Sequence, residues 1–187
     1  MTNVYLVGFM ASGKSSVGAA LAGLLDWQFE DLDARLCRRF DTSIAEVFAR
    51  VGEATFRAAE TEALRATARQ TGLVVATGGG AFCCKTNRRI MADAGRTVFL
   101  DVPWAVLAGR LVGSEHERPL HRGVDASRRL LERRLPCYLQ AEITVSLDGS
   151  ETPQEAAELV ADALGESAGV SGTAGGGRRI EELSCGS

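Results

Sequence analysis

The chain has 187 residues, of which 45% are hydrophobic and 24% charged, and its formal net charge is −3. That length suits one well-packed catalytic domain, and the near balance of charges excludes the broad basic surface that attracts nucleic acid or an acidic membrane. Because the sequence has no apolar run of about twenty residues, no signal-peptide pattern and no C-x-x-C pair among its five cysteines, we expect a cytoplasmic protein with reduced thiols and small-molecule partners.

The first predicted element is a short buried strand over residues 3–7, which runs into the glycine-rich stretch VGFMASGKSSVG at residues 7–18. This stretch fits G-x-x-x-x-G-K-[ST], in which backbone N–H groups wrap phosphate oxygens, Lys14 reaches the β- and γ-phosphates and Ser15 offers its hydroxyl to Mg²⁺. A helical pattern follows at once, and the free N–H groups and dipole of a helix N-terminus favour phosphate. The loop residues that we expect to bind the nucleotide are Gly8, Ala11, Ser12, Gly13, Lys14, Ser15 and Ser16.

Four further runs of apolar or β-branched residues lie near residues 27–30, 73–77, 97–102 and 142–147, with helical patterns between them. Five strands that alternate with helices predict an α/β fold, a three-layer α/β/α arrangement with a five-stranded parallel sheet of the P-loop NTPase type. The last helix is expected to begin with Thr152 as its N-cap and Pro153 at its first position, and to end at Gly165. We therefore expect a single, monomeric domain over residues 1–165 and a disordered Gly- and Ser-rich tail over residues 166–187.

Polar residues follow two of the predicted strands at the edge where open α/β sheets bind ligands. Asp31 and Asp33 come just after the second strand, where both carboxylates can point to one side near the mouth of the P-loop. Residues 78–80 are three glycines after the third strand, which would let a substrate approach bare backbone N–H groups. Taken alone, the two aspartates also suit a turn, and the three glycines also suit a flexible connection.

Arginines supply the remaining candidates. Arg57 lies near the start of a helix with Glu60 one turn on, where the carboxylate can orient it. Arg118 and Arg134 lie in the second half of the chain, in ERPL and RRLPCY. A solvated surface is the common fate of a single arginine, so the set carries more weight than any member of it. The N-K-x-D string with which switch GTPases hold guanine is absent, which favours a small-molecule kinase over that class.

Seven motifs in order resemble the shikimate kinases, relatives of the nucleoside-monophosphate kinases. They are G-x-x-x-x-G-K-S-S-V-G, D-L-D, S-I-x-E-V-F, G-E-x-x-F-R-x-x-E, T-G-G-G, R-P-L and R-x-P-x-Y, spread over about residues 3–164. The resemblance implies transfer of the γ-phosphoryl group of ATP, with Mg²⁺, to the 3-hydroxyl of shikimate in aromatic amino acid biosynthesis. One departure is Asp41, which stands where the family usually has glycine.

The resemblance also implies a role for each matching residue. Lys14, Asp33 and Arg118 would be catalytic, with Asp33 also holding ring hydroxyls and accepting the proton, and Arg118 carried by a lid over residues 112–123. Asp31 would act with Ser15 on Mg²⁺. The substrate carboxylate would be held by Arg57 and Arg134 with backbone donors from Gly78, Gly79 and Gly80. Adenine would be flanked by Arg110 and residues 150–153, which include Pro153.

Two other functions are compatible with the P-loop. One is a related sugar-acid kinase such as gluconate kinase, and the arginine pair with the glycine run argues against it. The other is a catalytically silent binding module with a kinase fold, and the intact Lys14, Ser15, Asp33 and Arg118 argue against that.

Overall fold

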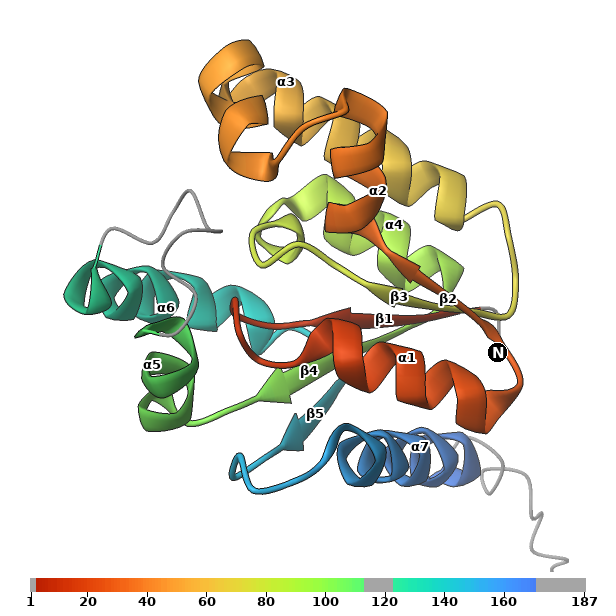
Figure 1. The fold of residues 1–187 in the computed structure, drawn as a ribbon. Coiled ribbons are helices and arrows are strands. Elements are labelled where there is room, and N and C mark those ends of the chain that lie inside the picture. Colours follow the sequence, from red (N-terminus) through yellow and green to blue (C-terminus); the bar gives the residue numbers. More distant parts are fainter. Residues whose placement is uncertain (1–2, 113–122, 171–187) are drawn as a thin grey trace, which may run out of the picture.

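Five parallel strands form one sheet through the centre of the molecule, in the order β2-β3-β1-β4-β5 (Figure 1). The computed structural model describes residues 3–112 and 123–170. The strands are β1 (Asn3–Val7), β2 (Gln28–Asp31), β3 (Leu73–Ala76), β4 (Arg96–Asp101) and β5 (Ile143–Ser146). They match the five runs expected from the sequence to within one residue at each end, which confirms the predicted parallel α/β fold.

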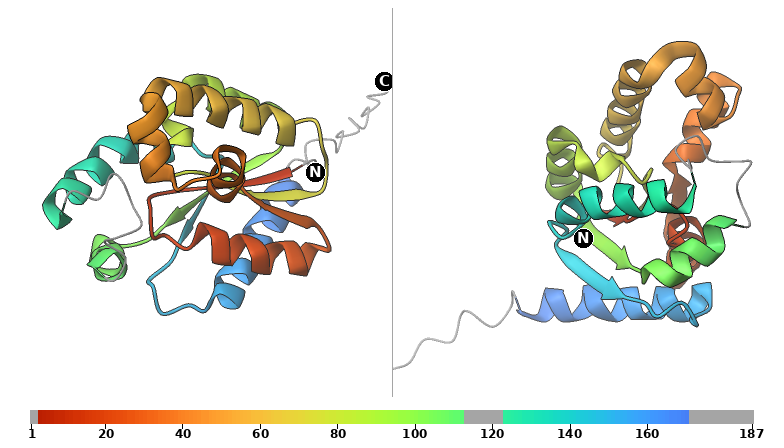
Figure 2. Two further views of the ribbon diagram at one scale, coloured as in Figure 1. Left: turned by 45° about the horizontal axis from the view of Figure 1, so that its top comes forward. Right: turned by 90° about the vertical axis from the view of Figure 1, so that its left-hand side faces the viewer.

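Helices cover both faces of the sheet (Figures 1 and 2). One face carries α1 (Lys14–Leu25) and α7 (Pro153–Val170), and the other carries α3 (Ile44–Thr67), α4 (Lys85–Ala94) and the short 3₁₀ helix η1 (Ala81–Cys83). α2 (Leu32–Phe40) packs on α3, while α5 (Trp104–Val112) and α6 (Val124–Tyr138) lie beyond the end of β4. Within the described residues, none of the helices combines the length and the apolar character needed to cross a membrane.

The core lies between the central strand and these helices. Every residue of β1 is buried, because a parallel strand covered on both faces has no solvent side. Over residues 56–67 of α3 the buried face comprises Phe56, Ala59, Glu60, Ala63, Leu64 and Thr67. The sheet is therefore held rigidly, with its carboxyl edge free to carry loops.

A bend divides α3 into two arms at Gly52, whose φ of +80° and ψ of 164° are not helical. A positive φ of this kind is strained for any residue with a Cβ, so glycine suits the position. The bend folds the first arm back and brings the rings of Phe48 and Phe56 to 4.6 Å between centroids. Both rings thereby line the cleft described below.

The last helix runs past its expected end. Thr152 caps it as predicted, because the Glu155 N–H donates to Thr152 Oγ1 at 3.2 Å and the Thr152 N–H donates to Glu155 Oε2 at 2.7 Å. The helix does not end at Gly165 but continues to Val170. A glycine costs a helix only about 1 kcal/mol relative to alanine, so one glycine need not end it. Residues 171–187 of the expected tail lie outside the described part of the chain.

Asp41 ends α2 in the left-handed conformation, with φ 50° and ψ 42°, and its N–H donates to the Cys37 carbonyl. This is the conformation for which glycine is favoured at a helix C-terminus, and aspartate is one of the few other residues that adopt it. Asp41 therefore forms the left-handed turn that glycine commonly makes at the end of a helix.

Candidate active site

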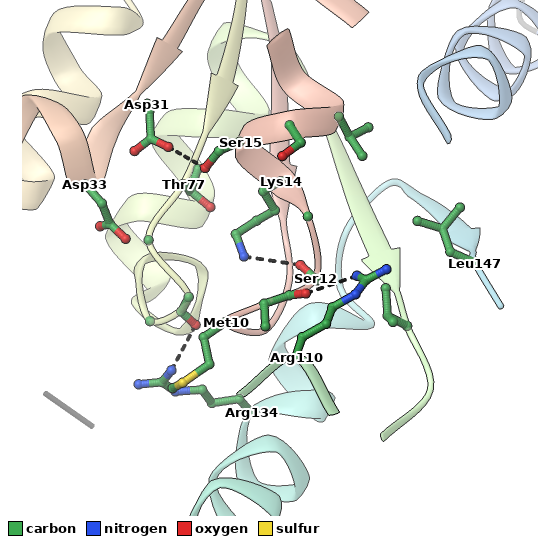
Figure 3. A pocket seen from close by; sticks show the side chains of 18 of the residues that line it. Met10, Ser12, Lys14, Ser15, Asp31, Asp33, Thr77, Arg110, Arg134 and Leu147 are labelled. Atoms are coloured by element: carbon green, nitrogen blue, oxygen red, sulfur yellow. Dashed lines mark hydrogen bonds between the residues drawn. The ribbon is translucent and has the colours of Figure 1, made fainter. Parts of the chain in front are cut away.

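A cleft of about 630 Å³ opens at the carboxyl edge of the sheet (Figure 3). It is lined by almost all of the described residues predicted to bind ligands, namely Ala11, Ser12, Gly13, Lys14, Ser15, Ser16, Asp31, Asp33, Arg57, Gly78, Gly79, Gly80, Arg110, Arg134 and Pro153. Gly8 is the exception, since it is buried against β4, where an added Cβ would lie 3.0 Å from the Leu100 carbonyl oxygen. Arg118 and residues 113–122 of the expected lid lie outside the described residues.

The loop between β1 and α1 surrounds the ammonium group of Lys14. Gly13 caps α1 with a φ of +90°, which turns the loop back over the helix N-terminus. Lys14 Nζ donates to the carbonyl oxygens of Gly8 at 3.0 Å and Phe9 at 2.6 Å, and to Ser12 Oγ at 3.2 Å. Only 9% of Lys14 is exposed. A positive charge and a helix N-terminus thus face the same point, which suits a polyphosphate.

Oxygen ligands meet next to this loop. Ser15 Oγ, at the start of α1, donates to Asp31 Oδ2 at 2.5 Å. Asp31 also caps α2, because its Oδ1 accepts from the Ala34 N–H at 3.0 Å. Hydroxyl and carboxylate oxygens are the hard donors that Mg²⁺ takes, and a magnesium site is often completed by water and substrate phosphates. The Ser15–Asp31 pair therefore fits a magnesium ion bound together with a nucleotide.

Asp33 lies one residue into α2 and faces the glycine run. A Cβ added at Gly78 would lie 2.7 Å from Asp33 Oδ1 and 3.0 Å from Glu60 Oε1. The missing side chain at Gly78 therefore leaves room for two carboxylates of this protein as well as for a ligand. From the sequence, the absence of side chains at residues 78–80 was explained only by the close approach of a substrate, and the room needed by Asp33 and Glu60 was not foreseen.

Arg57 projects from the second arm of α3 between two carboxylates. Its Nη1 lies 2.9 Å from Glu60 Oε2 and its Nη2 lies 3.4 Å from Glu53 Oε1. The guanidinium also lies over the rings of Phe56 and Phe48, at 5.3 and 5.8 Å from their centroids. The predicted Arg57–Glu60 pair is thus formed, and the orientation of the guanidinium is fixed on several sides.

The charged side chains of Arg57 and Glu60 shift each other's pKa values, and Glu53 also shifts the pKa of Arg57. Burial raises the pKa of Glu60, and the same carboxyl is pulled the other way by the Arg57 guanidinium beside it. Burial lowers the pKa of Arg57, but Glu60 and Glu53 together raise it further than burial lowers it, so the guanidinium stays charged. Glu60 is 1% exposed, and its Oε1 finds no hydrogen-bond partner among the described residues. One carboxylate oxygen thus remains for a ligand beside Asp33.

A second arginine reaches the glycine run from another helix. Arg134, on α6, donates from Nη1 to the Gly79 carbonyl oxygen at 3.2 Å (Figure 3), and the Tyr138 hydroxyl donates to the same oxygen at 2.5 Å. Arg57 lies against the next residue, since a Cβ at Gly80 would be 2.7 Å from its Nη2. Two guanidinium groups from α3 and α6 therefore flank adjacent glycines, an arrangement suited to a carboxylate.

The far end of the cleft is less polar. Arg110, on α5, donates from Nη1 to the Ala11 carbonyl oxygen at 3.2 Å and so ties α5 to the P-loop. The loop after β5 is held by Glu151, whose carboxylate accepts from the N–H groups of Asp148 and Gly149, both at 2.9 Å. Pro153 lies beside this loop among apolar lining residues. This end could hold a flat base above the phosphate site.

Several lining residues were not predicted from the sequence. They are mostly apolar and comprise Met10, Val17, Ile44, Phe48, Phe56, Thr77, Val102, Leu147, Gly149 and Ala156. Helical spacing of apolar residues predicts a buried face, but it does not show whether that face packs on the sheet or lines a cleft.

Comparisons with known proteins agree with this geometry. A family model described as shikimate kinase matches residues 10–165. A shikimate kinase of Geobacter sulfurreducens is 40% identical over 160 residues, which cover 84% of this chain and 88% of that protein. The solved structure of a shikimate kinase from Acinetobacter baumannii in complex with shikimate has a TM-score of 0.84 at 32% identity and covers 89% of this chain and 94% of that one. A gluconokinase from Sinorhizobium meliloti 1021, with a TM-score of 0.53 at 22% identity, is alike in fold alone.

Proposed function

The chain belongs to the shikimate kinase family, and we infer from this that it uses ATP to phosphorylate the 3-hydroxyl of shikimate, a step of aromatic amino acid biosynthesis. The products are shikimate 3-phosphate and ADP. The observation that carries this assignment is that the Arg57 and Arg134 side chains contact the adjacent residues Gly80 and Gly79. Both arginines line the same cleft as the Lys14 loop. A carboxylate site beside a phosphate site fits an acidic alcohol as the acceptor.

At the phosphate site, the residues position and neutralise charge more than they react. Phosphoryl transfer spreads negative charge over the transferred group, and the Lys14 ammonium offsets that charge from inside the loop. Ser15 and Asp31 would hold Mg²⁺, which when bound supplies further positive charge against the β- and γ-phosphate oxygens. Arg118, carried by the proposed lid, would add a further cation and help to exclude water.

At the acceptor, Asp33 orients the hydroxyl and receives its proton. The hydroxyl oxygen forms the new bond to the γ-phosphorus, the bond to the leaving oxygen of ADP breaks, and the hydroxyl proton passes to the Asp33 carboxylate. The room at Gly78 is what supports this role, because it lets the carboxylate reach the cleft. Glu60 Oε1 lies beside the same glycine and has no hydrogen-bond partner among the described residues, so it can accept a hydrogen bond from a second ring hydroxyl.

The substrate carboxylate is held between Arg57 and Arg134. A guanidinium donates two parallel hydrogen bonds to a carboxylate, and two such groups fix both its position and its plane. Phe48 and Phe56 form an apolar wall beside Arg57 against which a carbocyclic ring can pack. We propose that ATP occupies the P-loop with its base between Arg110 and Pro153, and that the protein acts as a cytoplasmic monomer.

Replacing either arginine with leucine tests the carboxylate site. We expect Arg57→Leu and Arg134→Leu each to raise KM for shikimate about ten- to a hundredfold, because a charge-assisted hydrogen bond contributes about 1.5–3 kcal/mol. The KM for ATP should change little. The double variant should lose less than the sum of the two, since a carboxylate freed on one side can shift or admit water.

The matched control is Arg133→Leu, which removes an exposed arginine of the same helix that does not line the cleft. It should leave both KM values unchanged. A shikimate analogue without the carboxylate should bind the wild type poorly and distinguish little between the wild type and the double variant. If that analogue were phosphorylated as well as shikimate, or if Arg57→Leu raised only the KM for ATP, the carboxylate assignment would be wrong.

A further inference from the structure

A buried asparagine links the helix that carries Arg57 to the segment that follows Gly80. Asn87 lies in the first turn of α4 and is 1% exposed. Its Oδ1 accepts from Thr61 Oγ1 on α3 at 2.8 Å, and its Nδ2 donates to the Ala81 carbonyl oxygen of η1 at 3.1 Å. α3, α4 and η1 are mutual neighbours in the fold (Figure 1), and this one side chain contacts the other two elements.

Both ends of this link are next to the carboxylate site. Thr61 lies one helical turn after Arg57, and its hydroxyl is also 3.0 Å from the Arg57 carbonyl oxygen. Ala81 directly follows Gly80, against which the Arg57 guanidinium is packed. The chain of contacts from Arg57 through Thr61, Asn87 and Ala81 to Gly80 therefore closes a ring around one corner of the cleft.

The chemistry of the amide explains why asparagine suits this position. A planar amide presents an acceptor and a donor side by side, so it can bridge a hydroxyl and a carbonyl group at once. Aspartate offers no donor to the Ala81 carbonyl, and leucine offers neither group. The next residue, Arg88, donates from Nη1 to the carbonyl oxygens of Phe82 at 2.8 Å and Cys83 at 3.1 Å. Adjacent side chains of α4 thus hold three consecutive carbonyls of η1.

We propose that Asn87 is a positioning residue for the acceptor substrate. By bridging α3 and η1 it sets the spacing between the Arg57 guanidinium and the backbone at Gly79 and Gly80, so that both reach the same carboxylate. This proposal rests on the carboxylate role of Arg57 proposed above. A small displacement between two groups that hold one ligand weakens binding strongly, because the ligand can then satisfy only one of them.

The test uses Thr61→Val, which keeps the shape of the side chain and removes the hydroxyl that donates to Asn87. We expect KM for shikimate to rise about tenfold, with KM for ATP and kcat nearly unchanged, because the carboxylate is held away from the reacting hydroxyl. Thr61→Ser keeps the hydroxyl and should retain the wild-type KM. Asn87→Leu, which removes both bonds, should raise KM for shikimate at least as far.

The control is Thr67→Val, which removes a buried hydroxyl from the same helix at its other end, where Thr67 Oγ1 donates to the Leu64 carbonyl at 2.8 Å. It should lower the melting temperature and leave KM for shikimate unchanged. If Thr61→Val lowered the melting temperature in the same way without raising that KM, Asn87 would be structural only and the proposal would be wrong.

A double-variant comparison separates this proposal from the one on which it rests. Once Arg57 is leucine there is no guanidinium to position, so Thr61→Val should raise KM for shikimate far less in the Arg57→Leu background than in the wild type. An equal rise in both backgrounds would overturn the positioning role. An unchanged KM for shikimate in Arg57→Leu alone would instead overturn the carboxylate role of Arg57.

Discussion

Replacing Lys14 with methionine should lower kcat at least a hundredfold while the fold is retained. The ammonium lies inside the P-loop within reach of the phosphate site, and the loss of one preorganised group that stabilises developing charge commonly costs about 3 kcal/mol or more. Methionine keeps an unbranched apolar stem of similar length, so packing in the loop is largely preserved. The measurement is kcat at saturating ATP and shikimate, with circular dichroism and melting temperature as checks on the fold.

Lys85→Met is the matched control, because it makes the same substitution at an exposed lysine at the start of α4 that does not line the cleft. Its kcat should equal that of the wild type. Near-normal turnover by Lys14→Met would contradict the assignment of the P-loop as the phosphate site.

The second large effect is expected for Asp33→Asn, which should lower kcat about a hundredfold to ten-thousandfold and leave ATP binding nearly unchanged. The amide keeps the shape of the side chain but loses the negative charge and the proton affinity that the acceptor hydroxyl needs. Steady-state kcat and the Kd for ATP in the absence of shikimate are the two quantities to compare.

Asp31→Asn is the variant to compare with Asp33→Asn. It removes the carboxylate charge without loss of the helix cap, because asparagine is as good an N-cap for α2 as aspartate. This variant should raise the Mg²⁺ concentration needed for half-maximal activity, whereas Asp33→Asn should not. If Asp33→Asn weakened ATP binding and kept a normal kcat at saturating nucleotide, Asp33 would act on the nucleotide or the metal instead of the acceptor.

The sequence predicted the features of this protein that depend on local patterns. The inner strands β3, β1 and β4 are buried, largely apolar runs, and the edge strands β2 and β5 carry fewer buried residues but still contain apolar or β-branched residues, so all five were located. The P-loop spacing located the Lys14 loop, and helical spacing located the Arg57–Glu60 pair. Each of these depends on residues that are close together in the chain.

Contacts between distant segments had no such pattern. The bend at Gly52 and the apolar wall that it forms with Phe48 and Phe56 arise only when two helical arms pack together. The link from Thr61 through Asn87 to Ala81 joins three elements, and a single asparagine in a helical stretch gives no periodic signal. The run of α7 past Gly165 was missed because a single glycine disfavours a helix only weakly.

The acceptor is tested most directly by measuring initial rates of ADP release from ATP with shikimate and with gluconate as alternative acceptors, and by identifying the product by ³¹P NMR. We predict rapid release of ADP with shikimate, one new phosphate monoester on its 3-hydroxyl for each ADP, and no release above background with gluconate. Preferential phosphorylation of gluconate, or binding of ATP without turnover of either acceptor, would contradict the assignment.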